Sequence, residues 1–484
     1  MMKSIRFTNA EITMAGNLFL PENFNESACY PAIVVVHPSG GVKEQTSGLY
    51  AEELARHGYI TLAFDAAYQG ESSGEPRQLE NPYHRVEDIS AAIDYLVAQH
   101  CVDEQRIGVV GICAGGGYAI HATMLDRRIK ALGTVSAVNY GDMYRQGWEG
   151  NQQPASSLEL LQMAAEQRTA EAKGAATGYL PTTPSSVEEA QNRDFAEAYE
   201  YYRTPRAMHR NAPSRFTTRS LAQLVTYDAF NLANIFLTQP MLVIAGSEAG
   251  TRWMTEEIYQ RAASQNKNLH IVNGATHIAM YDQPEYVSEA AGKFVSFFAE
   301  HLYRQLADFD LVMLINNAGF GDFSMPWDID LAKATRMLDL NVKALTTLSL
   351  LYTRDYADRE ATLINVSSVG GYSLFDIAVT YCATKFFVAA FTEGLAQNLR
   401  DQGKKMRAKV IAPGPTQSEF VVHSSDNGGI SGDGLFAEES FITAEKLADY
   451  TWQLFDSDST VGIVNTDRQL MLKSPVYPYI NVPH

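Results

Sequence analysis

The chain has 484 residues, of which 46% are hydrophobic and 19% charged, and its formal net charge is −18. This length exceeds one ordinary domain and the composition is globular, so we expect at least two folded units and exclude bulk disorder. The acidic surplus shows no basic stripe, which argues against nucleic acid or an anionic membrane as partner and favours a small-molecule substrate.

Short apolar runs bounded by turn residues alternate with helical stretches in the first part of the chain. Such runs are typical of buried parallel strands joined by crossover helices, so they predict an α/β sheet. Between about 139 and 235 polar and Ala-rich helical sequence replaces the strand signal and predicts an inserted cap. An amphipathic helix over 285–303 closes this first unit, 1–303. The expected strands are 32–37, 59–65, 107–110, 131–136 and 241–245.

A second α/β alternation occupies 304–484. No Pro/Gly/Ser linker separates the two units, and the junction at 304–310 is so short that the closing helix should lead directly into the next strand. Expected strands lie within 311–319, 361–368, 407–414 and 460–465, with helices near 330–353, 380–402 and 443–455.

The strand at 107–110 runs into Gly111-Ile112-Cys113-Ala114-Gly115 and then into a helix. A strand-to-helix reversal this sharp needs small residues two positions either side of its centre, which places Cys113 at a nucleophile position. The dipole of the following helix predicts that the thiolate is favoured there.

Two further loops supply matching groups. Ser39 and Gly40 follow an apolar strand, so their backbone N–H groups and that of Ala114 form a candidate oxyanion hole. His277, in the sequence Gly-Ala-Thr-His, is the candidate base. The order nucleophile, acid, base along the chain is that of α/β-hydrolases.

The whole of 1–303 therefore resembles an α/β-hydrolase of the dienelactone-hydrolase-like group. This resemblance implies that Cys113, activated by His277, attacks an ester or lactone carbonyl to give an acyl-enzyme that water cleaves. The third member, usually Asp, is missing from the loop after strand 241–245; Glu248 is the candidate there, with Glu256 and Glu257 behind it.

The glycines of the turn also match the dinucleotide-loop spacing Gly-x-x-x-Gly-x-Gly, as Gly111, Gly115 and Gly117. A dinucleotide loop follows the first strand of its domain, whereas several strands precede this one. We therefore favour the nucleophile turn. Asp65, which also follows a strand, is interpreted as an acid that structures a loop.

The chain from 311 onward contains Asn316-Asn317-Ala318-Gly319 after a strand, then Asn341, Ser368, and Tyr381 with Lys385. In this set it resembles a short-chain dehydrogenase/reductase. Tyr381 and Lys385 lie four apart on one helix face, so the ammonium is expected to lower the phenol pKa and let Tyr381 act as acid and base. Ser368 would hold a substrate carbonyl, and the resemblance implies a proton relay through Asn341 and a ribose contact for Lys385. The nucleotide-binding residues it implies are Asn316, Ala318, Gly319, Lys385, Pro413 and Gly414.

The resemblance to the reductase family begins at that family's fourth strand. The glycine turn and first strands that hold a dinucleotide pyrophosphate have no counterpart, so we expect this unit to be a partial Rossmann-like unit without useful NAD(P) affinity. Strand 311–315 would become an edge, which predicts docking on the first unit or formation of a homo-oligomer.

The main prediction is a cytoplasmic hydrolase of small esters, thioesters or lactones that requires no cofactor. Four scattered cysteines and no signal peptide or long apolar segment support the location and argue against a metal site. Two alternatives stay open. One is an NADP-dependent oxidoreductase that uses Ser368, Tyr381 and Lys385 and completes its cofactor site with another chain; the other is a non-catalytic binding protein.

Overall fold

The computed structural model describes residues 1–22, 24–153, 157–305, 311–417 and 441–480. It divides into two compact units, Met1–His301 and Leu302–His484, close to the boundary expected after 303. The last helix of the first unit, α11 (Pro284–Gln305), extends to the expected junction, of which 306–310 lie outside the described residues. None of the described helices combines the length and apolar character needed to cross a membrane.

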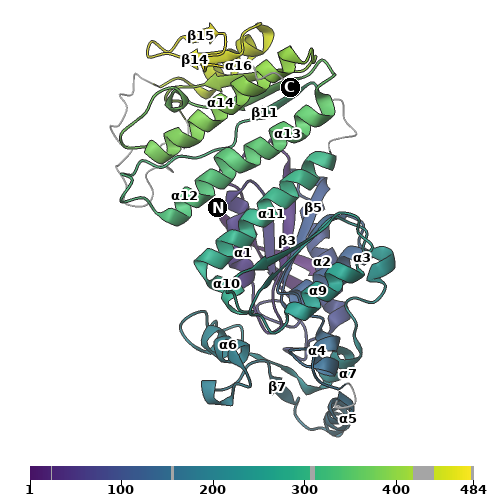
Figure 1. The fold of residues 1–484 in the computed structure, drawn as a ribbon. Helices are drawn as coiled ribbons and strands as arrows, with labels where there is room; N and C mark the ends of the chain where they lie inside the picture. Colours follow the sequence, from purple (N-terminus) through teal and green to yellow (C-terminus); the bar gives the residue numbers. More distant parts are fainter. Residues whose placement is uncertain (23, 154–156, 306–310, 418–440, 481–484) are drawn as a thin grey trace. The chain divides into compact units, whose positions relative to one another are not determined.

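The N-terminal unit is built on an eight-stranded sheet with the strand order β1-β2-β4-β3-β5-β6-β9-β10 (Figure 1). β1, β2 and β4 pair antiparallel, and the remaining pairs are parallel. The strands are β1 (Met2–Asn9), β2 (Ile12–Phe19), β3 (Tyr30–Val36), β4 (Ile60–Asp65), β5 (Val102–Ile112), β6 (Ile129–Val135), β9 (Met241–Gly246) and β10 (Lys267–Val272).

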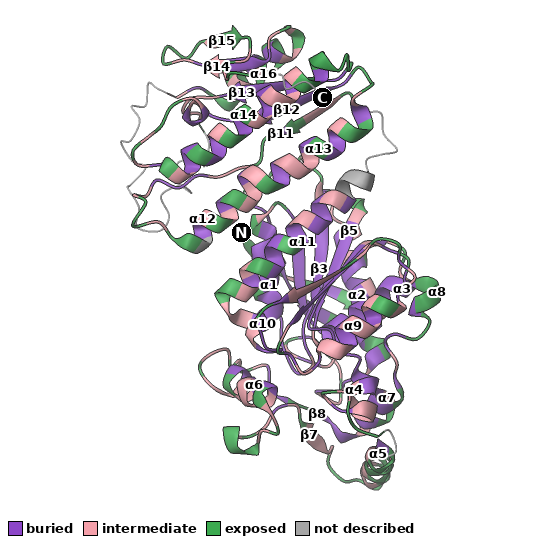
Figure 2. Ribbon diagram, viewed as in Figure 1, coloured by how far each residue is buried: buried purple, intermediate pink, exposed green. Residues whose placement is uncertain are grey.

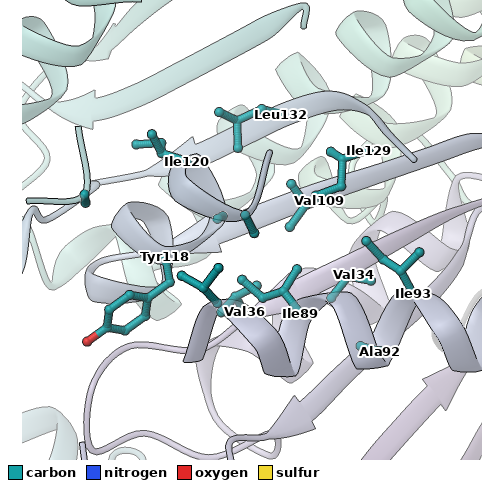
Figure 3. Packing of buried hydrophobic residues seen from close by; sticks show 14 of the residues in the cluster. Val34, Val36, Ile89, Ala92, Ile93, Val109, Tyr118, Ile120, Ile129 and Leu132 are labelled. Atoms are coloured by element: carbon teal, nitrogen blue, oxygen red, sulfur yellow. The ribbon is translucent and has the colours of Figure 1, made fainter. Parts of the chain in front are cut away.

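Helices cover the sheet, and the core lies between the layers. The β-branched residues that made 32–37 a predicted strand are buried, since a central parallel strand is covered on both faces. Figure 3 shows Val34, Val36 and Val109 of the sheet near Ile89 and Ile93 of α2. The helices are α1 (Thr46–Arg56), α2 (Pro82–Val97), α3 (Ala114–Leu125), α9 (Arg252–Arg261), α10 (Ala279–Asp282) and α11.

The segment that connects β6 to β9 is an insertion of short helices and two short strands, called the cap below. Most of α5 is exposed (Figure 2). The cap helix α6 buries Tyr201 and Tyr202 in the same core cluster as Tyr281 of α10. The cap elements are α4 (Tyr140–Gln146), α5 (Leu158–Ala172), β7 (Tyr179–Pro181), α6 (Arg193–Arg203), β8 (Arg215–Thr217), α7 (Leu221–Thr226) and α8 (Ala233–Phe236).

The C-terminal unit has a five-stranded sheet of order β11-β12-β13-β14-β15, parallel except for the last pair. Within the described part of the chain β11 ends this sheet, with β12 on its one paired side. The α/β fold class is thus confirmed for both units. The elements are β11 (Met313–Asn316), α12 (Leu331–Leu338), the π-helix η4 (Asp339–Ala344), α13 (Leu345–Tyr356), β12 (Thr362–Val366), α14 (Val379–Asp401), β13 (Arg407–Ala412), α16 (Ala444–Asp456), β14 (Val461–Val464) and β15 (Leu470–Lys473).

Candidate active site

Cys113 lies between β5 and α3 in a backbone conformation that side chains rarely adopt, with φ of 56° and ψ of −125°. The surrounding glycines make this turn sterically possible. A Cβ on Gly111 would lie 2.3 Å from the Gly115 carbonyl oxygen, and one on Gly115 would lie 2.4 Å from the Val36 carbonyl oxygen. These glycines pack against the protein's own backbone, which argues for a nucleophile turn and against a nucleotide loop.

The Cys113 thiol is protonated at neutral pH. Burial raises its pKa to about 11, although the backbone N–H of Ala114 and the hydroxyl of Tyr281 favour the thiolate. The thiolate expected from the helix dipole is therefore not the resting form, because loss of hydration outweighs these donors. Any attack by this sulfur requires a base that removes the proton.

His277 is buried in the loop between β10 and α10. Its Nδ1 lies 2.6 Å from Thr251 Oγ1, and its Nε2 lies 3.1 Å from the Tyr281 hydroxyl. Burial lowers its pKa to about 4, only partly opposed by the negative charge of Asp194. The imidazole is thus neutral at pH 7 and has a lone pair available to accept a proton.

The structure corrects the placement of the predicted acid. Glu248 is half-exposed and forms an ion pair with Arg193, so it does not occupy the position beside His277 Nδ1, which Thr251 holds. The reserve candidates face arginines as well: Glu256 pairs with Arg252, and Glu257 pairs with Arg261. Loop position alone suggested these residues, but their side chains turn outward to cations.

A carboxylate from the cap holds the base loop instead. Asp194, on α6, accepts a hydrogen bond from the backbone N–H of His277 at 3.1 Å. Its other oxygen accepts from Trp148 Nε1 at 2.7 Å and from the Gly250 N–H at 2.8 Å. Three N–H groups donate to this one buried carboxylate. The carboxylate therefore joins the cap to the loop that carries His277 and to the loop that carries Thr251.

The candidate oxyanion loop is held by a neutral histidine. His37 Nδ1 lies 2.6 Å from the Pro38 carbonyl, and its Nε2 accepts the Ala66 N–H at 3.1 Å. Among the described residues, no hydrogen bond engages the backbone N–H of Ser39 or Gly40. The N–H of Ala114 points toward the Cys113 sulfur, as an oxyanion donor should.

A buried ion pair lies close to the elbow. Arg85 and Glu80 are 2.9 Å apart, and the Arg85 guanidinium donates to the His37 carbonyl at 2.7 Å. Tyr118, on α3, donates to the same Glu80 at 2.7 Å, which joins the elbow helix to the oxyanion loop. Asp65 structures a neighbouring loop, as expected, by accepting from Lys43 and from the Glu71 N–H.

The C-terminal unit also brings its predicted reactive residues together. Tyr381 lies within hydrogen-bonding reach of Ser368, and the Lys385 ammonium is 5.7 Å from the centre of the Tyr381 ring. Burial lowers the pKa of Lys385 to about 8. The expected lowering of the Tyr381 pKa is wrong: burial raises it instead. Asn341, in the π-helical segment, bonds to both backbone polar groups of Phe320.

The nucleotide-binding prediction receives less structural support. Asn316 uses its side-chain amide within the protein, toward Ser349 and Asn365, and the Pro413 carbonyl accepts from Val369. Gly319 adjoins Asn341 and Lys385, while Ala318 is exposed and Gly414 half-buried. Within the described residues, β12 is the one strand paired with β11, and the expected lack of NAD(P) affinity stays a prediction.

Comparison with known proteins agrees with the geometry of the N-terminal unit. The model of the alpha/beta hydrolase family matches residues 33–290, more than half of the chain. The chain belongs to the alpha/beta hydrolase family. Protein YcjY of Escherichia coli is 48% identical over 305 residues, which cover 62% of this chain and 100% of YcjY.

Two further similar proteins are a solved structure and a thiohydrolase. The crystal structure of PA2218 from Pseudomonas aeruginosa has a TM-score of 0.57 at 32% identity and covers 62% of this chain and 94% of that one. Thiohydrolase aneE of Aspergillus aculeatus is 34% identical over 124 residues, which cover 26% of this chain and 37% of aneE.

The short chain dehydrogenase model matches residues 253–428 and so overlaps the hydrolase match. The structure assigns the overlap to the hydrolase, because β10 pairs with β9 of the eight-stranded sheet. Outside this overlap, the part of the chain that is similar to a short-chain dehydrogenase is residues 291–428.

Three residues of the site escaped the sequence analysis. Tyr281 could have been found from its spacing, since a position four after His277 often faces the same side of a helical segment. Thr251 follows β9 at the edge where Cys113 follows β5, but a single hydroxyl is an ordinary residue. Asp194 has no signal, because it lies 83 residues from His277 in a cap without a motif.

Proposed function

We propose that the protein hydrolyses a small ester, thioester or lactone through an acyl-enzyme on Cys113. The observation that carries this proposal is the strained elbow at Cys113, whose thiol reaches Tyr281, which in turn contacts Nε2 of the buried neutral base His277. The match to a thiohydrolase supports a thioester or related acyl substrate.

The residues divide the reaction among them. Proton removal from Cys113 toward His277 lets the sulfur attack the carbonyl carbon, and the N–H groups of Ala114 and the Ser39-Gly40 loop stabilise the oxyanion. His277 then returns the proton to the leaving group as the carbon–oxygen or carbon–sulfur bond breaks. Water, deprotonated by the same base, releases the acid and regenerates the thiol.

A panel of short-chain esters, thioesters and lactones tests this proposal. The wild type should hydrolyse at least one class, and Cys113→Ala should lose about three orders of magnitude in kcat/KM, because no nucleophile remains. Cys29→Ala, which removes an exposed thiol of the same unit, is the matched control and should keep wild-type rates. Equal hydrolysis by Cys113→Ala and wild type would contradict the mechanism.

A second candidate function is reduction or oxidation by the C-terminal unit with NADP, the missing part of the nucleotide site being supplied by another chain. The contact between Ser368 and Tyr381, with Lys385 beside them, favours it. Fluorescence titration with NADPH distinguishes the two: we expect no micromolar binding, whereas binding weakened by Tyr381→Phe would establish the oxidoreductase.

A further inference from the structure

The nucleophile and the base of the N-terminal unit are joined through a third side chain. Among the described interactions, Cys113 and His277 have no direct hydrogen bond. Both instead reach one hydroxyl: Tyr281 lies 3.1 Å from His277 Nε2 and within hydrogen-bonding reach of the Cys113 thiol. A general base must contact the proton that it takes, directly or through one intermediary.

The hydrogen-bonding capacity of Tyr281 matches its surroundings. A phenol has one proton to donate and can accept hydrogen bonds on its oxygen. The Tyr281 hydroxyl has three neighbours: His277 Nε2, the Cys113 thiol and the hydroxyl of Tyr202 on the cap. With the imidazole proton on Nδ1 and the thiol protonated, the phenol can donate to Nε2 while its oxygen accepts from the thiol and from Tyr202, so one arrangement serves all three contacts.

The position of Tyr281 is rigid. The residue is buried on α10, and its ring packs edge-on against Tyr201 and Tyr202, with ring centres 5.3 and 6.5 Å away. Thr251 fixes the other nitrogen of His277, so the imidazole keeps Nε2 toward the phenol. The cap thus fixes the phenol between the thiol and the imidazole.

We propose that Tyr281 is a catalytic residue that relays the proton from Cys113 to His277; this inference rests on the proposed hydrolase function. As the sulfur bonds to the carbonyl carbon, the thiol proton moves to the Tyr281 oxygen and the phenol proton moves to His277 Nε2. The carbonyl π electrons move to the oxyanion, and the relay runs in reverse when the leaving group or the final thiol takes its proton.

Rapid-mixing measurement of the acylation burst with p-nitrophenyl acetate tests the relay. Tyr281→Phe keeps the ring but removes the hydroxyl, and we expect its acylation rate constant to fall about 100-fold, the low end for loss of acid–base catalysis. The matched control is Tyr50→Phe. Tyr50 is a buried tyrosine whose hydroxyl donates to the Met280 carbonyl next to Tyr281, so this variant should stay within about two-fold of wild type.

The outcomes separate the relay from the hydrolase proposal. A wild type that hydrolyses no class of the ester, thioester and lactone panel in a Cys113-dependent way overturns both. A burst that Tyr281→Phe retains within two-fold, or that Tyr50→Phe loses equally, overturns the relay alone, because the phenol is then dispensable or merely structural.

A second measurement does not depend on the folding of Tyr281→Phe. The infrared S–H band of Cys113, identified by its disappearance in Cys113→Ala, should lie at lower frequency than that of a free thiol, because the thiol donates to the phenol oxygen. A band at the free-thiol position would overturn the relay.

Discussion

In the N-terminal unit the candidate nucleophile Cys113 follows β5, which has strands on both sides; in the C-terminal unit Ser368 follows β12, in a sheet that within the described residues ends one strand away, at β11. Both units nevertheless bring a hydroxyl or thiol, a buried tyrosine and a basic side chain together. Such a cluster needs only one strand end and the helices beside it. The surroundings of the two clusters differ, because β5 lies in the middle of its sheet whereas β12 lies next to β11, the last described strand of its sheet.

The largest expected effect tests whether the activity belongs to the N-terminal unit. His277→Gln should lower ester hydrolysis about 1000-fold, because the protonated thiol then has no acceptor for its proton. His270→Gln removes a histidine of β10 that pairs with Glu289 of α11, and this variant should keep the wild-type rate. Steady-state rates of both variants and of Tyr381→Phe check the comparison; loss of hydrolysis in Tyr381→Phe would assign the activity to the other unit.

The ionisation of Cys113 gives the next effect. Because burial raises the thiol pKa from 9.0 to about 11, the thiolate fraction at pH 7 should be about 100-fold below that of an exposed cysteine. Alkylation by iodoacetamide should therefore be slow at neutral pH and should rise with pH until about 11. An inflection below pH 8 would mean that the helix dipole outweighs burial after all.

The link between cap and base predicts a smaller loss. Asp194→Asn keeps the size of the side chain. The NH₂ group of the amide, however, then faces backbone or indole N–H donors, and these donors have no acceptor left at that position. We expect kcat/KM to fall about 10-fold, consistent with one poorly satisfied buried polar group. Glu200→Gln, an exposed change on the same helix, is the control. Equal rates for the two variants would disconnect the cap carboxylate from the base.

The smallest effect concerns the stability of the C-terminal unit. Burial lowers the pKa of Lys385 in the folded state to about 8. The unfolded chain therefore holds the lysine proton more tightly than the folded chain does. At pH 7 the buried charge thus lowers the free energy of unfolding. Lys385→Met should raise the free energy of unfolding by about 1 kcal/mol, the gain being reduced because the Val366 carbonyl loses its donor. The gain should shrink as the pH rises from 8 to 10.5. Denaturant unfolding at both ends of this range measures it.

The fold was more predictable from sequence than the site. Runs such as 32–37 reveal buried parallel strands because both faces demand apolar, mostly β-branched side chains. The short β15 was missed, since a four-residue strand with exposed side chains has no such pattern. The hydrolase fold is confirmed, whereas the dienelactone-hydrolase-like subtype remains a prediction.

The residues of the site also differ in how far the sequence could predict them. Cys113 and His277 were selected because their local turns have a recognisable sequence. Glu248 was selected by chain position, and position does not determine which way a loop side chain points. Thr251, Asp194 and Tyr281 act through contacts that arise only once the cap and sheet have folded together. The ionisation of Cys113 was misjudged for a related reason, since burial depends on the whole unit.

The carboxylate of Asp194 also bears on how this enzyme could diversify. Under the proposed function, exchange of the cap would be a route to new substrate preferences, because the cap is a contiguous insertion between β6 and β9. Here the cap carries the carboxylate that holds the loop of His277. A transplanted cap without an acid at the position of Asp194 would therefore change selectivity and lower turnover together. Chimaeras that retain α6 should avoid this penalty.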